Sequence, residues 1–443
     1  MAFKNTMALL LSLFLIISCA SKPTEFNDSE DALSTGGPTT QQFHSVVYYP
    51  HELSLNFPGY IVGLEKVPVE NITDNPKDVI LTSKVPNNDV SDTYLFGKVV
   101  EKKTLLVTHI MNSRNDNSCA IYSAYESDSE GNLERCSPVE NYPGNLYEKS
   151  WRAMDALRTV LKEDISERLT TDDTADDYTH IIIVVMGWNT NQEEAVRNFN
   201  SLGSNLVAAS KGKANPLFIG LSWPSLWESS IVDPLYKLFS YPNKADDADE
   251  VGLTWLGVLI HETIKGLEVP KTVVIGHSFG ARATSMASCV GPAITRDGTM
   301  LPRNNVDMLI SLQGAYSMNR FYPNDGIEKL HYQGCEQAGK VLLTSSVHDL
   351  AMDTGRWAPF VGNETTFKEF CIDKIADKFS CQKVGSSGLL DLSNIQKHFI
   401  YVDSDDLIKY NAHKSGGGAH SDIYRIQMGN LIWSALEGLP DAN

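Results

Sequence analysis

The sequence predicts an α/β protein with a mostly parallel central sheet flanked by helices and with a β-rich N-terminal extension. The first observation behind this prediction is that short apolar segments alternate with helical segments from residue 180 onward, which is typical of parallel sheets covered on both faces. The second is the string GHSFG at residues 276–280, which follows the β-branched segment 271–275 and precedes small residues at 281–289. That order predicts a strand, a tight turn and a helix.

The remaining elements follow from the spacing of apolar residues. A helix is expected over residues 147–169, where Trp151, Met154 and Leu157 recur at helical spacing. The other expected strands are residues 180–186, 217–221, 306–312, 340–345 and 397–402. Three other helices are expected. The first opens at Thr190 with a Thr190–Glu193 capping box, the second covers residues 249–267, and the third is a terminal helix capped by Ser421.

The N-terminal residues have the pattern of a segment that directs export. Lys4 precedes an apolar run at residues 7–17, which is too short to span a bilayer comfortably, and IISC follows at 16–19. This pattern resembles the lipobox of bacterial lipoproteins. The resemblance implies cleavage before Cys19 and lipidation of Cys19, and Ala20 in place of aspartate favours the outer membrane. An ordinary secretory signal is the alternative.

Composition divides the chain into four expected regions. Residues 20–43 are polar and rich in Ser, Thr, Gly, Pro and acidic residues, so they cannot bury enough apolar surface to fold alone. Strands expected at 46–49, 60–64, 92–96 and 104–108 are either leading strands of the main sheet or a small companion unit. The four regions are a signal peptide at 1–18, a flexible tether at 19–43, a β-rich region at 44–145 and the main α/β domain at 146–443.

Charge and cysteine content narrow the function classes. The net charge of −18 argues against a nucleic-acid partner, because phosphate repulsion would dominate. No cysteine spacing resembles a zinc site, and we expect neither a metal nor a cofactor. Removal of Cys19 from the seven cysteines leaves six, an even number in an exported chain. We expect the bridges Cys119–Cys136 and Cys371–Cys381, which leaves Cys289 and Cys335. Cys289 is expected either to be a buried free thiol or to form a bridge.

Ser278 is the candidate nucleophile. Gly276 and Gly280 permit a tight turn that exposes the serine at the end of the sheet, and the N-terminal end of the following helix faces the oxygen that becomes negative during attack. His277 points sideways within this turn and is expected to be structural. A serine hydroxyl is a weak nucleophile at its own pKa, so it requires a base and a carboxylate that orients the base.

Asp349 and His420 are the candidate acid and base. In sheets of this kind the partners of the serine lie on loops after later strands, in the order serine, acid, histidine. Asp349 stands at the carboxyl end of a predicted strand, with Asp353 as a nearby competitor and Asp325 as a more distant one. His420 follows the last predicted strand through a glycine-rich loop, and His413 in the same connection is the runner-up.

The oxyanion that forms during attack needs two backbone donors. One is expected to be the N–H of Phe279, directly after the nucleophile. The other is expected to be the N–H of Trp188, in the segment that ends the strand at 180–186. The size of Trp188 suits the wall of an acyl pocket equally well.

These motifs resemble those of the α/β-hydrolase superfamily and, within it, a bacterial group of uncharacterised hydrolases. The similarity covers roughly residues 175–437 and implies the α/β-hydrolase fold. Met186 stands where the group usually has histidine, and Gln313 stands at the place of an alternative acid, which favours Asp349. The matching strings are MGWN at 186–189, SWPS at 222–225, ADDAD at 245–249, GHSFG at 276–280, SSVHD at 345–349 and HS at 420–421.

The resemblance implies a membrane-anchored serine hydrolase that cleaves carboxylic esters, lipid esters among them, through an acyl-enzyme on Ser278. An acyltransferase and a non-catalytic surface or binding lipoprotein on the same scaffold are the alternatives. The expected partners are a small-molecule or lipid ester and, through Cys19, the membrane; the oligomeric state stays open. The apolar insert at 224–243 is either a lid or a packed loop.

Overall fold

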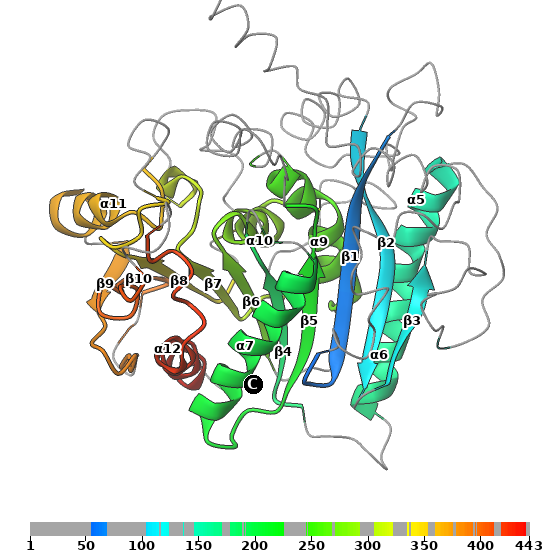
Figure 1. Cartoon of the computed structure of the whole chain (residues 1–443), viewed down its shortest axis with the longest axis horizontal. Coiled ribbons are helices and arrows are strands. Elements are labelled where there is room, and N and C mark those ends of the chain that lie inside the picture. The colour runs from blue at the N-terminus through cyan, green and yellow to red at the C-terminus, as the bar shows by residue number, and fades with distance from the viewer. Residues whose placement is uncertain are drawn as a thin grey trace, which may run out of the picture.

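The described part of the chain forms one ten-stranded sheet with helices on both faces (Figure 1). The strand order is β3-β2-β1-β5-β4-β6-β7-β8-β10-β9. The predicted α/β class with a mostly parallel sheet is therefore confirmed. The computed structural model describes residues 55–68, 103–114, 117–123, 146–170, 178–187, 192–225, 247–267, 271–292, 305–321, 338–352, 359–374, 378–392, 397–411 and 418–439, with a few single residues between these ranges.

Eight neighbouring strands of the sheet run parallel to one another. The residues of the central strands are mostly β-branched or Leu and are buried along the whole length of these strands, as expected for strands covered on both faces. In sheet order the strands are β1 Gly59–Pro68, β5 Pro216–Ser222, β4 His180–Val185, β6 Thr272–His277, β7 Met308–Leu312, β8 Lys340–Ser345, β10 Phe399–Asp403 and β9 Phe379–Lys383.

The N-terminal strands extend the main sheet at one edge. β1 pairs in parallel with β5, and β2 Lys103–Arg114 and β3 Asn117–Ser123 follow it as antiparallel neighbours. The strands expected at 60–64 and 104–108 lie within β1 and β2, whereas those expected at 46–49 and 92–96 lie outside the described residues. Of the two alternatives for this region, the described strands are leading strands of the main sheet.

The helices cover the two faces of the sheet in separate groups (Figure 1). Along β4, Ile181 and Ile183 face the core shared with α9 and α10, whereas Ile182 and Val184 face the core shared with α7 and α12. The helices are α5 Leu146–Asp155, continued by η3 Ala156–Leu161 and α6 Lys162–Thr170; α7 Gln192–Ser210; α9 Trp255–Val258, continued by η4 Leu259–Thr263; α10 Phe279–Cys289; α11 Glu364–Lys368, continued by η8 Glu369–Lys374; and α12 Ile426–Glu437.

One prediction about local structure was wrong, and one strand was not predicted. Ser421 does not cap the terminal helix, because α12 begins at Ile426 with Arg425 as its N-cap. Residues 419–425 form turns instead, which the buried carboxylate of Asp422 fixes by accepting bonds from the main-chain N–H groups of Tyr410 and Asn411. β9 was not predicted, since its sequence FSCQK is short, polar and half-buried at the edge of the sheet.

Three disulfides lie among the described residues. Cys119–Cys136 and Cys371–Cys381 form as predicted. Cys289 pairs with Cys335, so the free-thiol alternative for Cys289 is wrong. The spacing of 46 residues between these two cysteines gave no local signal, because only the fold brings Cys335 to the end of α10.

A buried ion-pair cluster ties α10 to two neighbouring segments. Arg282 on α10 donates from Nε and Nη2 to the two oxygens of Asp249, at 2.9 and 2.5 Å. Arg320, at the end of the 3-10 turn η5 Met318–Arg320, donates to Asp249 Oδ1 at 2.8 Å and to Ser285 Oγ at 2.7 Å. Burial opposes ionisation of Asp249, but the two guanidinium groups outweigh it and hold its pKa below the ordinary value.

We expect Asp249→Asn to lower the free energy of unfolding by about 3–5 kcal/mol, because it leaves the buried guanidinium of Arg320 and the partly buried one of Arg282 without their carboxylate. Urea denaturation followed by tryptophan fluorescence measures the change. Lys213→Met is the matched control, since it breaks an exposed pair with Glu437 and should leave the midpoint unchanged. An equal shift in both variants would contradict a stabilising role of the cluster.

Candidate active site

The carboxyl ends of β4, β6, β7 and β8 meet at one edge of the sheet, because these neighbouring strands are parallel. Each end supplies one residue to the same region. Gly187 follows β4, Ser278 follows β6, Gln313 follows β7 and Asp349 lies on the loop after β8. The sequence-predicted nucleophile and acid therefore emerge at the same edge.

Ser278 occupies a strained turn between β6 and α10. Its φ of 57° and ψ of −121° lie in a region that non-glycine residues rarely adopt, at a cost of about 1–3 kcal/mol. Main-chain bonds on both sides hold this conformation: the N–H of Ser278 donates to Leu312 O at 3.0 Å, and its carbonyl accepts from the N–H of Ala315 at 3.1 Å. The neighbouring strand β7 and the chain that follows it therefore fix the turn.

Three glycines make room for the turn, as the GHSFG and MGWN strings predicted. A Cβ at Gly276 would lie 2.4 Å from Ala281 Cα, and one at Gly280 would lie 2.1 Å from Val185 O. A Cβ at Gly187 would lie 2.5 Å from Ser278 Cβ and 3.0 Å from its Oγ. The chain after β4 is thus packed directly against the candidate nucleophile.

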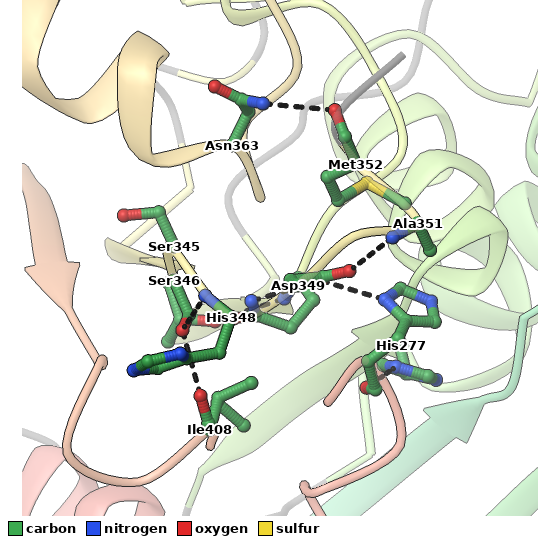
Figure 2. Close-up of polar contacts among 12 residues, drawn as sticks. His277, Ser345, Ser346, His348, Asp349, Ala351, Met352, Asn363 and Ile408 are labelled. Carbon is green, nitrogen blue, oxygen red and sulfur yellow. Dashed lines mark hydrogen bonds and ion pairs between the residues drawn. The ribbon is translucent and has the colours of Figure 1, made fainter. Parts of the chain in front are cut away.

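The structure joins the predicted acid and base. His420 Nδ1 lies 2.8 Å from Asp349 Oδ2, and the carboxylate is buried. The other oxygen, Oδ1, accepts the main-chain N–H of Ala351 at 3.1 Å, one of the bonds drawn in Figure 2. Asp349 also forms a β-bridge with Gly418, which fixes the loop carrying His420 against the loop carrying the acid.

The loop that carries Asp349 is anchored on both sides (Figure 2). Ser346 Oγ donates to Ile408 O at 2.9 Å and accepts the N–H of His348 at 3.1 Å. Asn363 Nδ2 donates to Met352 O at 3.0 Å on the far side of the acid. The carboxylate is therefore presented by a rigid loop rather than by a free strand end.

His277 contacts the predicted base and directly precedes the predicted nucleophile. Its Nε2–H donates to the carbonyl oxygen of His420 at 3.0 Å, and the two rings lie with centroids 4.5 Å apart. Burial, with the adjacent His420, holds the pKa of His277 well below its usual range, so His277 stays neutral. The structure thus places His420 against the residue that precedes Ser278. His277 was expected to be only structural, and this contact was not predicted; adjacency to Ser278 was its sole signal in the sequence.

The predicted oxyanion donors are only partly described. Phe279 is the first residue of α10, so its N–H belongs to the helix end where N–H groups point out of the helix. Trp188 lies outside the described residues. Both ends of its segment are nevertheless held by the SWPS string: Trp223 Nε1 donates to Met186 O at 2.9 Å, and Ser225 Oγ accepts the N–H of Thr190 at 3.1 Å.

Met186 directly follows β4, and its side chain contacts Tyr424. Tyr424 Oη donates to its sulfur at 3.5 Å. Burial and the negative charge of Glu194 raise the pKa of Tyr424 above its ordinary value, so the hydroxyl stays a donor. Trp223 binds the carbonyl of Met186 rather than its side chain, so it fixes the main chain after β4.

Several candidates fall outside the described residues. These are Cys19, Asp325, Asp353, His413 and residues 226–243 of the insert. Within the described ranges, no group of His, Cys, Asp and Glu side chains is arranged to hold a metal ion. A search of the same ranges found no helix with the length and apolar character needed to cross a membrane.

No protein-family model matches the chain, and no curated protein matches it in sequence. What the site does is therefore inferred from its geometry. A serine in a strained turn, a histidine against the residue before that serine and a buried carboxylate bonded to that histidine are the components of nucleophilic catalysis at a serine.

We expect the neutral state of His277 to make stability pH-dependent. Unfolded His277 binds a proton near pH 6.5, whereas the folded form does not, so stability is full above that pH and falls as the pH drops, by up to about 1.4 kcal/mol per unit. Urea midpoints at pH 7, 6 and 5 measure this slope. His277→Gln, which can still donate a hydrogen bond but cannot titrate, should have the shallower slope; parallel slopes would show that His277 is protonated in the fold.

Proposed function

We propose that this chain is a serine hydrolase of the α/β-hydrolase fold that cleaves carboxylic esters through an acyl-enzyme on Ser278. One observation supports this proposal above all: His420 is bonded to the buried Asp349 and lies against the residue that precedes a serine in a strained turn. Backbone strain of this kind persists where function requires it. A non-catalytic binding protein on the same scaffold would have no use for it.

The proposed reaction begins with attack of Ser278 Oγ on the ester carbonyl carbon, while His420 Nε2 takes the hydroxyl proton. Asp349 holds the Nδ1–H tautomer and stabilises the imidazolium. The N–H groups of Phe279 and Trp188 stabilise the tetrahedral oxyanion. His420 then protonates the leaving alcohol, and a water molecule repeats the sequence to release the acid. Transfer of the acyl group to another alcohol is the alternative outcome of the second step.

The proposed location is the cell envelope, with the chain anchored by lipid on Cys19, in a bacterial outer membrane. The three disulfides support an exported chain, because such bonds persist in oxidising compartments. The proposed substrates are small-molecule or lipid esters. Residues 146–443 would form the catalytic domain, and the strands before it complete one edge of its sheet.

We expect a fluorophosphonate probe to label the purified mature protein, because it reacts with serines activated by a neighbouring base. Ser278→Ala should abolish the labelling while the protein stays folded, as judged by circular dichroism. Labelling of the wild type that persists in Ser278→Ala would place the reactive serine elsewhere. A folded wild type that resists the probe would instead favour the non-catalytic binding lipoprotein.

We expect Asp349→Asn to lower kcat for p-nitrophenyl ester hydrolysis by about 10⁴-fold, because the amide favours the wrong imidazole tautomer. Asp307→Asn is the matched control. Asp307 accepts the N–H of Thr272 at the opposite ends of β6 and β7, so this variant should keep wild-type kcat. Equal losses in the two variants would show a loss of folding rather than of the acid.

A further inference from the structure

We propose that Gln313 is a positioning residue that fixes the triad acid for His420. This inference rests on the function proposed above. In the sequence, Gln313 marked only the absence of an alternative acid. Gln313 follows β7, directly beside the strand β8 that leads to Asp349. Its side chain is fully buried, and its Nε2 donates to Asp349 Oδ2 at 3.1 Å. That oxygen is the one bonded to His420.

Thr344 fixes which end of the amide faces the acid. The N–H of Gln313 donates to Thr344 Oγ1 at 3.0 Å, and this hydroxyl donates to Gln313 Oε1 at 2.7 Å, closer than its contact of 3.4 Å with Ser311 O. The reversed amide would set its oxygen against the carboxylate, where two acceptors repel. The bonding pattern therefore assigns the NH₂ group of Gln313 to Asp349.

The backbone at Gln313 gives an independent indication that the glutamine side chain is required. Its φ is +49°, in the left-handed region where a residue other than glycine costs about 1–3 kcal/mol. Glycine would relieve that strain, and Gly314 follows immediately. The strain is held by dense packing, because a Cβ at Gly362 would lie 2.8 Å from the carbonyl carbon of Gln313. A strained glutamine at this position is explained if its side chain is required.

The contacts of the carboxylate show what the glutamine does. Asp349 Oδ1 accepts the N–H of Ala351, and Oδ2 accepts both Gln313 and His420. Bonds to both oxygens prevent rotation of the carboxylate about its Cβ–Cγ bond, so Oδ2 stays directed at Nδ1 of His420. An amide also does not titrate, so Gln313 supports the buried negative charge without competing with His420 for a proton.

The test compares the wild type, Gln313→Met and Gln313→Glu in fluorophosphonate labelling rate and in kcat and KM for a p-nitrophenyl ester. Methionine keeps the volume but has no donor. We expect labelling rate and kcat to fall about ten- to a hundredfold in Gln313→Met, with KM unchanged, as for loss of a bond to a charged group. Thr263→Val is the control and should keep wild-type kcat. It removes a buried hydroxyl of η4 that donates to Leu157 O in η3.

The pH profile of Gln313→Glu provides a readout that a merely structural role would not change. At low pH one of the two adjacent carboxyl groups is protonated and donates in place of the amide, so the ratio of variant to wild-type rate is high. As the pH rises, both groups ionise, the donor is lost and the ratio falls. The surrounding titratable groups are His277, Tyr316, His348, Tyr401 and His420. All of them are present in both the wild type and the variant, so their own titration cancels in the ratio of the two rates.

The outcomes separate this inference from the function on which it rests. An unlabelled wild type would overturn both. A labelled wild type with normal kcat in Gln313→Met, or with a pH-independent ratio for Gln313→Glu, would overturn the role of Gln313 and leave the serine hydrolase proposal intact. Equal losses of kcat in Gln313→Met and Thr263→Val would also overturn it, since the effect would then be one of stability.

Discussion

The strained turn at Ser278 is the constraint on which the rest of the site depends. A non-glycine residue at φ 57° and ψ −121° persists only where its surroundings leave no alternative, and here β7 and the chain after it bind both its N–H and its carbonyl. The turn also demands close approach, which explains the absence of a Cβ at Gly187 and Gly280. Parallel pairing of β4, β6, β7 and β8 then gathers the remaining side chains at the same edge.

The support around the turn extends well beyond the three candidate catalytic residues, Ser278, Asp349 and His420. Asp249 binds Arg282 and Arg320 and so fixes α10, the helix whose first turn follows the serine. His277 binds the main chain of His420 from the strand side, while Gln313 binds the acid from the neighbouring strand. Each of these contacts joins elements far apart in the sequence. The site is consequently rigid in its described part, which is the condition that preorganised catalysis requires.

Much of this arrangement could be predicted from the sequence, because local patterns encode it. The β-branched runs gave the central strands, and the glycines gave the turn at Ser278. Asp349 and His420 could be singled out from their places after predicted strands. β9 was not predicted, because an edge strand that is half-exposed to solvent lacks a continuous apolar run. The start of α12, the Cys289–Cys335 bridge and the contact of Gln313 with Asp349 depend on segments that only folding brings together, so no local pattern records them.

The central claim is that Ser278 forms a covalent acyl intermediate. Its most direct test is rapid mixing of the mature protein with a p-nitrophenyl ester, followed by intact-mass measurement and peptide mapping after acid quenching. We predict a burst of about one p-nitrophenol per protein molecule and an acyl adduct on the peptide that contains Ser278. Steady ester cleavage with no burst and no adduct, or an adduct on another residue, would contradict the account.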